Sequence, residues 1–341
     1  MLVRDDDPAE DWTLPGVYEV SSGLYRIPLP LPEDGLRAVN VYAVRDGGGL
    51  VMVDSGWALA EARDLLEQAV KGLGCGLPDI RRFLVTHVHR DHYTMAVAVR
   101  REFGTPVALG RGEAGTLRIA RGQADYTALL GPLSRGGAQD LGREFARLPV
   151  DQRPEDWADP DEWIDAPADI SLTSGTWQAY PTPGHTRGHV VFVDAGRDVM
   201  FAGDHVLPRI TPSIGFESNT ARMPLRDYLD SLALVRALPD RRLLPAHGPV
   251  APSVHTRVDE LIEHHDTRLA RIQDAIGKQP GTAAEVARRL LWTRRDRTFG
   301  ELDLLSQCLA VTETLAHLDV LVATGRLRET GEDGIAYFSA A

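Results

Sequence analysis

One stretch, Thr86-His87-Val88-His89-Arg90-Asp91-His92-Tyr93, constrains this chain most, because it gathers three histidines and an aspartate into a few consecutive residues. His87 and His89 are two positions apart, so their side chains leave the same face of an extended segment. Neutral imidazoles and carboxylates are ligands of Zn²⁺ and of similar divalent metals. A solvated polar loop rarely carries so dense a set, and the stretch therefore predicts a metal site.

The flanking segments place this cluster between a strand and a helix. Residues 82–86 form a short apolar run that predicts a buried strand. Residues 94–103 have helical apolar spacing and stop at Gly104. Loops that join a strand to a helix are where α/β folds place their chemistry, so we expect an α/β protein with its site here.

Three later motifs strengthen the metal interpretation: Thr182-Pro183-Gly184-His185-Thr186, Phe201-Ala202-Gly203-Asp204-His205 and Pro245-Ala246-His247-Gly248. With the first stretch, they resemble the metallo-β-lactamase-fold hydrolase superfamily over about residues 17–250. The resemblance implies an αββα sandwich for a catalytic domain of residues 1–252. It also implies seven metal ligands: His87, His89 and His185 for a first metal, Asp91, His92 and His247 for a second, and Asp204 as the bridge between them.

Three neighbouring polar residues are expected to support the ligands. In the resembled family, the aspartate of the Val53-Asp54-Ser55-Gly56 element orients a ligand histidine, and Asp54 is assigned that role. The alternative for Asp54 is an ordinary turn or helix-start residue. His189 is expected to be a hydrogen-bonded or core histidine, and His205 a structural residue in preference to a substrate contact.

Two residues are candidates for substrate binding. Tyr93 stands directly after the ligand stretch, where many relatives carry small residues. Arg209 lies in a Pro- and Gly-punctuated loop after Asp204 that is expected to rim the pocket. Its guanidinium could bind a substrate carboxylate or phosphate, and a surface arginine paired with a local carboxylate is an equal alternative.

Charge and cysteine content restrict the partners. The chain has 341 residues, a net charge of −12 and a pI of about 5.4, which argues against general affinity for nucleic acid or anionic membranes. Cys75 and Cys308 lie far apart, which suits a reducing cytoplasm. We see neither a signal peptide nor an apolar run that could span a bilayer. We therefore expect a cytoplasmic protein that acts on a small molecule.

The family pattern is interrupted at about residues 111–168. Residues 140–148 have helical periodicity, and Trp157 and Trp163 favour packing over disorder. Long insertions in compact domains are usually functional lids or disordered links. We expect this helical insertion to cover the substrate, with surface decoration or an oligomer contact as the alternative.

Residues 253–341 are predicted to form a small C-terminal domain. Helices are expected at 258–276, at 282–292 with a Thr282–Glu285 capping box, and at 302–324, followed by a hairpin. This order resembles a winged-helix module, as found after some metallo-β-lactamase-fold hydrolases, including certain ribonucleases. A winged helix that reads DNA should be basic, but residues 251–341 hold fourteen acidic and eleven basic residues. A packing or homodimer module is therefore expected.

The resemblance implies a dinuclear hydrolase. A hydroxide shared by two divalent metals would attack an ester or thioester carbonyl of a small molecule. Asp91 is given a catalytic part, holding the proton of the attacking water as well as binding metal. Zinc is the first choice of metal, and iron or manganese suits the same ligands. The alternatives are a phosphodiesterase or ribonuclease, and a di-iron redox or metal-binding protein.

Overall fold

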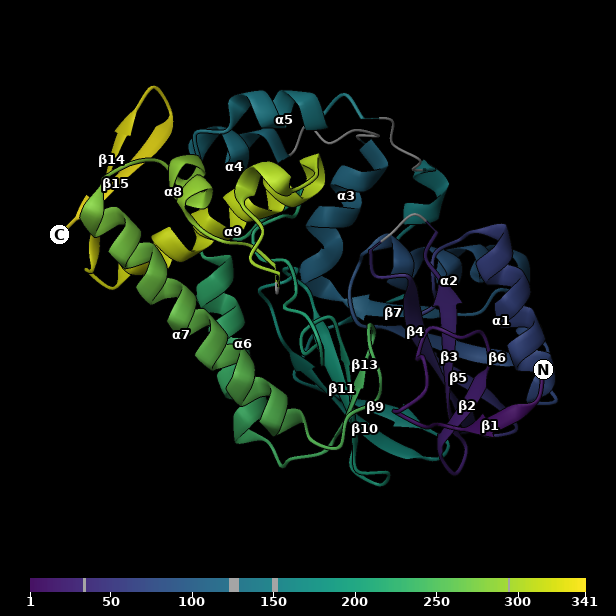
Figure 1. Ribbon diagram of the computed structural model, residues 1–341. Helices are drawn as coiled ribbons and strands as arrows, with labels where there is room; N and C mark the ends of the chain where they lie inside the picture. The colour runs from purple at the N-terminus through teal and green to yellow at the C-terminus, as the bar shows by residue number, and fades with distance from the viewer. Residues whose placement is uncertain (33–34, 123–128, 149–152, 294) are drawn as a thin grey trace.

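The computed structural model describes residues 1–32, 35–122, 129–148, 153–293 and 295–341. Two β-sheets pack face to face, and helices cover the outer face of each sheet (Figure 1). This four-layer αββα arrangement, followed by a smaller C-terminal unit, is the predicted fold class.

The larger sheet contains eight strands in chain order. They are β1 Val3–Asp5, β2 Val17–Ser21, β3 Leu24–Pro30, β4 Ala38–Asp46, β5 Gly49–Val53, β6 Ile80–Val85, β7 Val107–Gly110 and β8 Glu162–Ile164. Strands β2 to β5 are antiparallel neighbours, whereas β5 to β8 are parallel. Parallel neighbours need crossover connections, and helices α1 (Ala60–Gly72) and α2 (Arg90–Phe103) supply two of them.

The second sheet has five strands in the order β13-β12-β11-β10-β9. They are β9 Ala168–Leu172, β10 Gly175–Pro181, β11 Val190–Asp194, β12 Val199–Gly203 and β13 Arg242–Pro245. Helix α6 (Pro224–Ala237) connects the parallel pair β12 and β13 and covers the outer face of this sheet (Figure 1).

Alternating side chains separate the layers of the sandwich. Tyr42 of the larger sheet meets Phe201 of the second sheet in the interior, with ring centroids 5.4 Å apart. On the same strands of the second sheet, Val191 and Met200 point the other way and pack with α6. Because successive strand residues face opposite sides, these strands bury both faces, which explains their continuous apolar composition.

The C-terminal part has the expected order of elements: α7 Val254–Lys278, α8 Ala283–Arg289, α9 Leu304–Ala323, β14 Leu327–Glu332 and β15 Ile335–Ala340. The predicted capping box of Thr282 and Glu285 is present at the start of α8. One buried cluster contains side chains of α6 together with those of α7, α8 and α9. Since the core continues across residue 252, the domain boundary there stays a prediction.

The insertion forms helices α3 (Ala114–Gly122), α4 (Leu130–Arg135) and α5 (Gln139–Phe145) before it returns to the larger sheet as β8. Residues 123–128 and 149–152 of the predicted insertion lie outside the described residues. Trp157 is buried against the larger sheet's helical side, as its expected packing role requires. Helices α4 and α5 pack against α9, and Arg135 forms ion pairs with Asp319 and Glu329.

Helix α9 corrects one expectation. We expected no apolar run of bilayer length, but α9 has 20 residues and a mean hydropathy of 1.2 in its most apolar window. It is the one helix among the described residues with this length and composition. More than half of that window, 56%, is buried inside the protein, where α9 packs against α7 and α8. A helix that is apolar on all sides is equally suited to a protein core, so α9 is weak evidence for a membrane span.

Candidate metal centre

The seven predicted ligands follow the carboxyl ends of four strands. His87 to His92 follow β6, on a loop and the start of helix α2, and His185 follows β10. Asp204 follows β12 and His247 follows β13. Helix α2 begins at Arg90, earlier than predicted, so Asp91 and His92 occupy its first turn.

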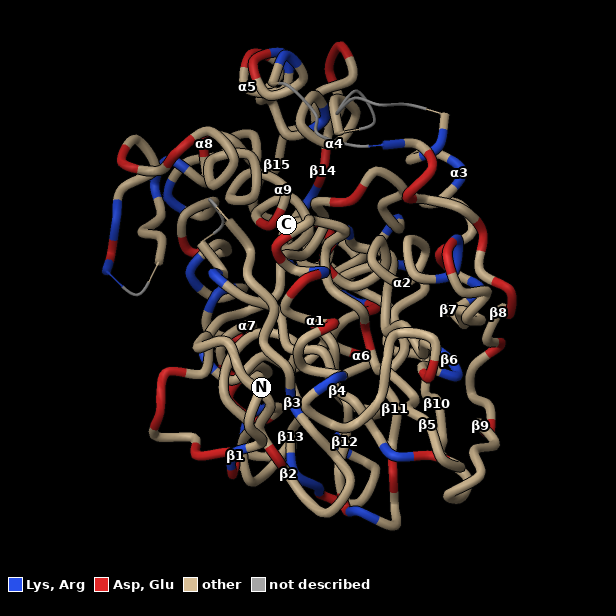
Figure 2. The backbone as a smooth tube through the Cα atoms, turned by 90° about the vertical axis from the view of Figure 1, so that its right-hand side faces the viewer, with Lys and Arg blue, Asp and Glu red and all other residues tan. Residues whose placement is uncertain are grey.

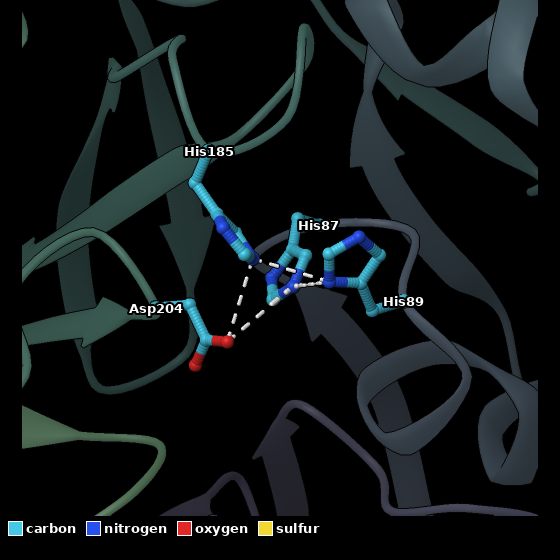
Figure 3. Close-up of side chains that lie close together, drawn as sticks. All are labelled: His87, His89, His185 and Asp204. Atoms are coloured by element: carbon cyan, nitrogen blue, oxygen red, sulfur yellow. Dashed lines mark hydrogen bonds and ion pairs between the residues drawn. The ribbon is translucent and has the colours of Figure 1, made fainter. Parts of the chain in front are cut away.

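The first ligand set contains His87, His89, His185 and Asp204, whose donor atoms all lie within 4.8 Å of one another (Figure 3). His89 Nδ1 lies 3.0 Å from His87 Nε2 and 3.1 Å from His185 Nε2. The Oδ2 atom of Asp204 is 3.4 Å from His185 Nε2 and 4.0 Å from His87 Nε2. Four donor atoms therefore converge on one point.

The second set contains Asp91, His92 and His247. The Oδ2 atom of Asp91 lies 3.6 Å from His92 Nε2 and 3.4 Å from His247 Nε2. The other oxygen of Asp204, Oδ1, lies 3.6 Å from His92 Nε2 and 3.4 Å from His247 Nε2. Asp204 thus directs one oxygen to each set, which is the arrangement of a bridging ligand.

In two ligand histidines, the ring nitrogen that faces away from the centre donates a hydrogen bond to a backbone carbonyl. The Nδ1 of His185 donates to the carbonyl of Ser213, and the Nδ1 of His247 donates to the carbonyl of Ala38, each at 2.8 Å. A carbonyl oxygen can only accept, so each proton lies on Nδ1 and each Nε2 keeps a free lone pair. The tautomer that metal binding needs is therefore fixed by the backbone.

Asp54 lies where the resemblance places it, beneath the ligands. Its Oδ2 is 2.8 Å from His92 Nδ1, and its Oδ1 accepts from the backbone N–H of Thr86 at 2.7 Å. The residue has a left-handed φ of +58°, a conformation that aspartate and asparagine tolerate better than most residues. Asp54 therefore orients His92 and at the same time ties down the start of the ligand loop.

The donor set fits divalent metal ions. His92 Nε2, His247 Nε2 and Asp204 Oδ1 are buried and have no hydrogen-bond partner among the described residues. Such groups are costly to leave unpaired, and three of them face a common centre. Nitrogen and carboxylate oxygen donors are those that zinc, iron and manganese accept.

Local charges distinguish the two sets. Burial, reinforced by His185, lowers the pKa of His89 to about 3, so this ring is neutral near pH 7. Burial would also lower the pKa of His92, but Asp91, Asp54 and Asp204 raise it to about 10. The carboxylates thus make the second set a place where positive charge is favoured.

His189 supports the bridging carboxylate without joining the ligands. Its Nδ1 donates to the hydroxyl of Thr182 at 2.8 Å, and its Nε2 accepts from the backbone N–H of Asp204 at 3.2 Å. A Cβ on Gly203, which has a φ of +50°, would lie 2.7 Å from His189 Nε2. A glycine before Asp204 is therefore required for this close approach.

His205 is fully buried, as a structural role requires. Its ring lies edge-on to Tyr228 with centroids 5.2 Å apart, and its carbonyl accepts from the Tyr228 hydroxyl at 2.9 Å. Both ring nitrogens lack a partner among the described residues.

The two candidates for substrate contact lie in different surroundings. Tyr93 is fully buried in the core between the larger sheet and its helices, and its hydroxyl donates to the carbonyl of Ala158 at 2.6 Å. A ring in this position cannot touch a substrate, so the assignment of Tyr93 to substrate binding is wrong. Arg209 is exposed on the loop after Asp204. The preceding residue, Pro208, packs against Gly248. The role of Arg209 in substrate binding stays a prediction.

Several supporting groups were missed from the sequence. The carbonyls of Ser213 and Ala38 gave no signal, because every residue offers a carbonyl. The buried carboxyl groups of Glu113 and Glu217 were also missed. The glycines at 110 and 112, directly after a buried strand, were a usable hint for Glu113, since glycine there often marks a close backbone approach.

Comparisons with known proteins agree with this geometry. The family described as the metallo-beta-lactamase superfamily matches residues 34–247, and one described as "Metallo-beta-lactamase-like, C-terminal domain" matches residues 269–341. A probable metallo-hydrolase, YqjP of Bacillus subtilis, is 25% identical over 92% of this chain and 96% of its own.

Two solved structures cover nearly the whole molecule. A beta-lactamase domain protein from Burkholderia ambifaria has a TM-score of 0.79 and 27% identity, covering 98% of this chain and 97% of that one. A metallo-beta-lactamase family protein from Thermus thermophilus has a TM-score of 0.76 and 27% identity, covering 95% of this chain and 100% of that one. The chain therefore belongs to the metallo-beta-lactamase superfamily and is a metal-dependent hydrolase.

Proposed function

We propose that this protein hydrolyses an ester or thioester bond of a small molecule, with two divalent metal ions, zinc in the first place. The observation that carries the proposal is the position of Asp204, with one oxygen toward each ligand set. When bound, the two ions would supply a water that ionises near neutral pH and a Lewis acid for the carbonyl oxygen.

The protein groups have distinct parts in this reaction. His185 and His247 keep their metal-facing nitrogens unprotonated through the carbonyl acceptors at their opposite nitrogens. The Asp91 carboxylate belongs to the second ligand set, with its Oδ2 3.4 Å from His247 Nε2. The nearby imidazoles outweigh the effect of burial and hold the pKa of Asp91 well below its usual range. Asp91 therefore stays ionised and can accept a hydrogen bond from the attacking water.

A cavity of small-molecule size lies between the insertion and the C-terminal part, and its lining residues include no member of either ligand set. It has a volume of about 600 Å³ and is walled by α4, α9, β14 and residues 215–224. Its lining mixes apolar side chains such as Met223 and Leu315 with Arg135 and Arg222. This volume is in the usual range for small-molecule pockets. The loop that walls it starts near Ser213, whose carbonyl holds His185. We therefore propose that the insertion, which supplies α4, and the C-terminal part cover the substrate.

The nucleic-acid alternative has less support. On the side shown in Figure 2, acidic and basic residues are interleaved along the described chain, with no continuous basic band. Residues 251–341 are net acidic, whereas a nucleic-acid-binding module is expected to present a basic surface. The ribonuclease alternative is retained as an outcome of the test below.

The test compares two substrate panels. Metal-loaded protein is offered acyl esters and thioesters in one panel and single-stranded RNA in the other, with Asp204→Ala as the control. We expect turnover of an ester or thioester that is lost in the control. RNA cleavage that is lost in the control, without ester or thioester turnover, would overturn the proposal.

Location and assembly are also proposals. Cys75 and Cys308 are both free thiols, which supports a reducing cytoplasmic location. We also propose that the C-terminal part forms a homodimer contact. The molecular mass of the protein in solution tests this.

A further inference from the structure

A buried carboxyl group, that of Glu113, lies between the two loops that carry the three histidines of the first ligand set. Glu113 follows β7 and is fully buried. Its Oε1 accepts a hydrogen bond from the hydroxyl of Thr186, the residue after His185. The backbone amides of Val88, between His87 and His89, and of Gly188 also favour the charged form of this carboxyl group. A single side chain is thus hydrogen-bonded to the His185 loop, and the amide of Val88 in the His87–His89 loop acts to lower its pKa.

Glycines allow this approach. A Cβ on Gly112 would lie 2.6 Å from the carbonyl oxygen of Arg187, and one on Gly188 would lie 2.6 Å from Cγ of Glu113. A Cβ on Gly110 would collide with the carbonyl oxygen of Gly188. Real Cβ atoms do not approach other atoms so closely, so the backbone after β7 and the His185 loop fit together only with glycine at these three positions.

A second carboxyl group connects Glu113 to a third loop. Glu217 belongs to the loop that follows Asp204, is 7% exposed, and accepts from the Thr116 hydroxyl at 2.8 Å. Burial and the neighbouring Glu217 raise the pKa of Glu113 well above its usual value. The Oε2 atom of Glu113 has no hydrogen-bond partner among the described residues. The hydrogen bond from Thr186 requires an acceptor at the Oε1 position.

We propose that Glu113 is a positioning residue that sets the spacing between His89 and His185 by joining their two loops. It is not a ligand, since neither ligand set includes it. The inference rests on the proposed metal centre and is independent of the substrate. Without Glu113, the Thr186 hydroxyl loses its acceptor, and the buried carboxyl group between the two histidine loops is lost.

The test measures Co²⁺ binding instead of turnover. Affinity is obtained by competition with a chelator, and the visible absorption of bound Co²⁺ reports the ligand geometry. We expect Glu113→Ala to weaken the binding about 10- to 100-fold, the range typical for residues that orient metal ligands. Glu113→Gln keeps an oxygen for Thr186, so we expect it to restore the affinity and the spectrum.

Two further variants separate positioning from general stability. Thr186→Val keeps the shape of the side chain and removes only the hydroxyl, so it should weaken Co²⁺ binding even if Glu113→Ala does not fold. Glu313→Ala replaces a partly buried glutamate on α9, which pairs loosely with Arg268 at 3.9 Å. It should lower the melting temperature and leave Co²⁺ affinity unchanged.

The outcomes are distinguishable. Wild-type protein that binds no Co²⁺ would remove the metal centre and this inference together. Wild-type protein that binds Co²⁺, with Glu113→Ala and Thr186→Val equal to it in affinity and spectrum, would overturn the role of Glu113 alone.

Discussion

For three ligand histidines, the hydrogen-bond partner of one ring nitrogen determines whether the metal-facing nitrogen is free of a proton. For His185 and His247 the partner is a backbone carbonyl, which side-chain substitution does not remove. For His92 the partner is the carboxylate of Asp54. Asp54 is therefore one residue at which the tautomer of a ligand can be changed by mutation, and Thr86, whose hydroxyl lies 3.1 Å from His87 Nδ1, is another.

We predict that Asp54→Asn weakens binding at the second ligand set about 10- to 100-fold, as is typical when a ligand's orienting partner is lost. Asparagine tolerates the φ of +58° and can keep an oxygen toward Thr86. Its amide nitrogen then faces His92 Nδ1, which favours the tautomer with the proton on Nε2, where the metal should bind. Titration with Co²⁺ measures the effect. Two unchanged binding steps would contradict it.

Some of the site residues could be predicted from the sequence and others could not. His87, His89 and Asp91 were predictable because they stand together after an apolar strand. Tyr93 was misplaced because neighbours on a helix face different directions, and its position on α2 turns it into the core. Glu113 could not be assigned, because its partner Thr186 lies far away in the chain.

At the scale of elements, two glycines differ in their surroundings: one is in close contact with a neighbouring loop and the other is not. Gly188 lies against the backbone after β7, whereas Gly277 lies near the end of α7 with open space around it. Gly188→Ala must push two loops apart, and Gly277→Ala adds a better helix former without any collision.

We predict opposite effects for these two substitutions. Gly188→Ala should lower the free energy of unfolding by roughly 1–3 kcal/mol, the usual cost of overpacking. Gly277→Ala should raise it by about 0.5–1 kcal/mol. Denaturant unfolding of the two variants beside wild type gives both values. Equal stability of Gly188→Ala and wild type would mean that the loops are not in backbone contact.

The insertion was only partly predictable at this scale. Its helical periodicity led to α5, and its tryptophans indicated packing. Strand β8 was not expected, because three residues with the pattern Glu162-Trp163-Ile164 give little periodicity. Its parallel pairing with β7 comes from tertiary packing, which sequence periodicity does not encode.

For the whole molecule, a buried histidine pair lies where the C-terminal helices meet. His265 Nδ1 of α7 and His317 Nε2 of α9 are 3.1 Å apart, and His317 Nδ1 donates to the carbonyl of Glu313. Titratable neighbours include Arg268 and His264, Tyr228, whose ring centroid lies 5.4 Å from that of His265, and Glu313, which pairs with Arg268. Burial lowers the pKa of His317 to about 3, and burial with His317 lowers that of His265 well below its usual value.

We therefore predict acid sensitivity from this pair. The folded protein keeps both rings neutral, whereas the unfolded chain binds protons below about pH 6.5. The free energy of unfolding is thus unaffected above that pH and falls below it, by up to about 1.4 kcal/mol per pH unit for each ring.

The matched variant carries His265→Phe and His317→Leu, which remove both titrating groups and leave the ligands intact. Unfolding is measured from pH 7.5 to pH 5 at one fixed metal concentration. The wild type should lose stability more steeply than the variant. Parallel curves would show that the pair does not govern the acid response.

At this scale the four-layer fold followed from the resemblance, whereas the order of strands and helices indicated only an α/β protein. The continuous packing from α6 through α9 did not, because the sequence shows apolar faces without showing which faces meet. The cavity between α4, α9 and residues 215–224 was equally hidden, since it is formed by three segments that are distant in the chain.

The central claim is a two-metal centre bridged by Asp204, and metal stoichiometry tests it most directly. Zinc content per chain is measured after loading and desalting, for wild type and for Asp204→Ala with its folding checked by circular dichroism. We predict two zinc ions per wild-type chain and at most one, more weakly held, in the folded variant. One zinc ion in the wild type, or two retained by Asp204→Ala, would contradict it.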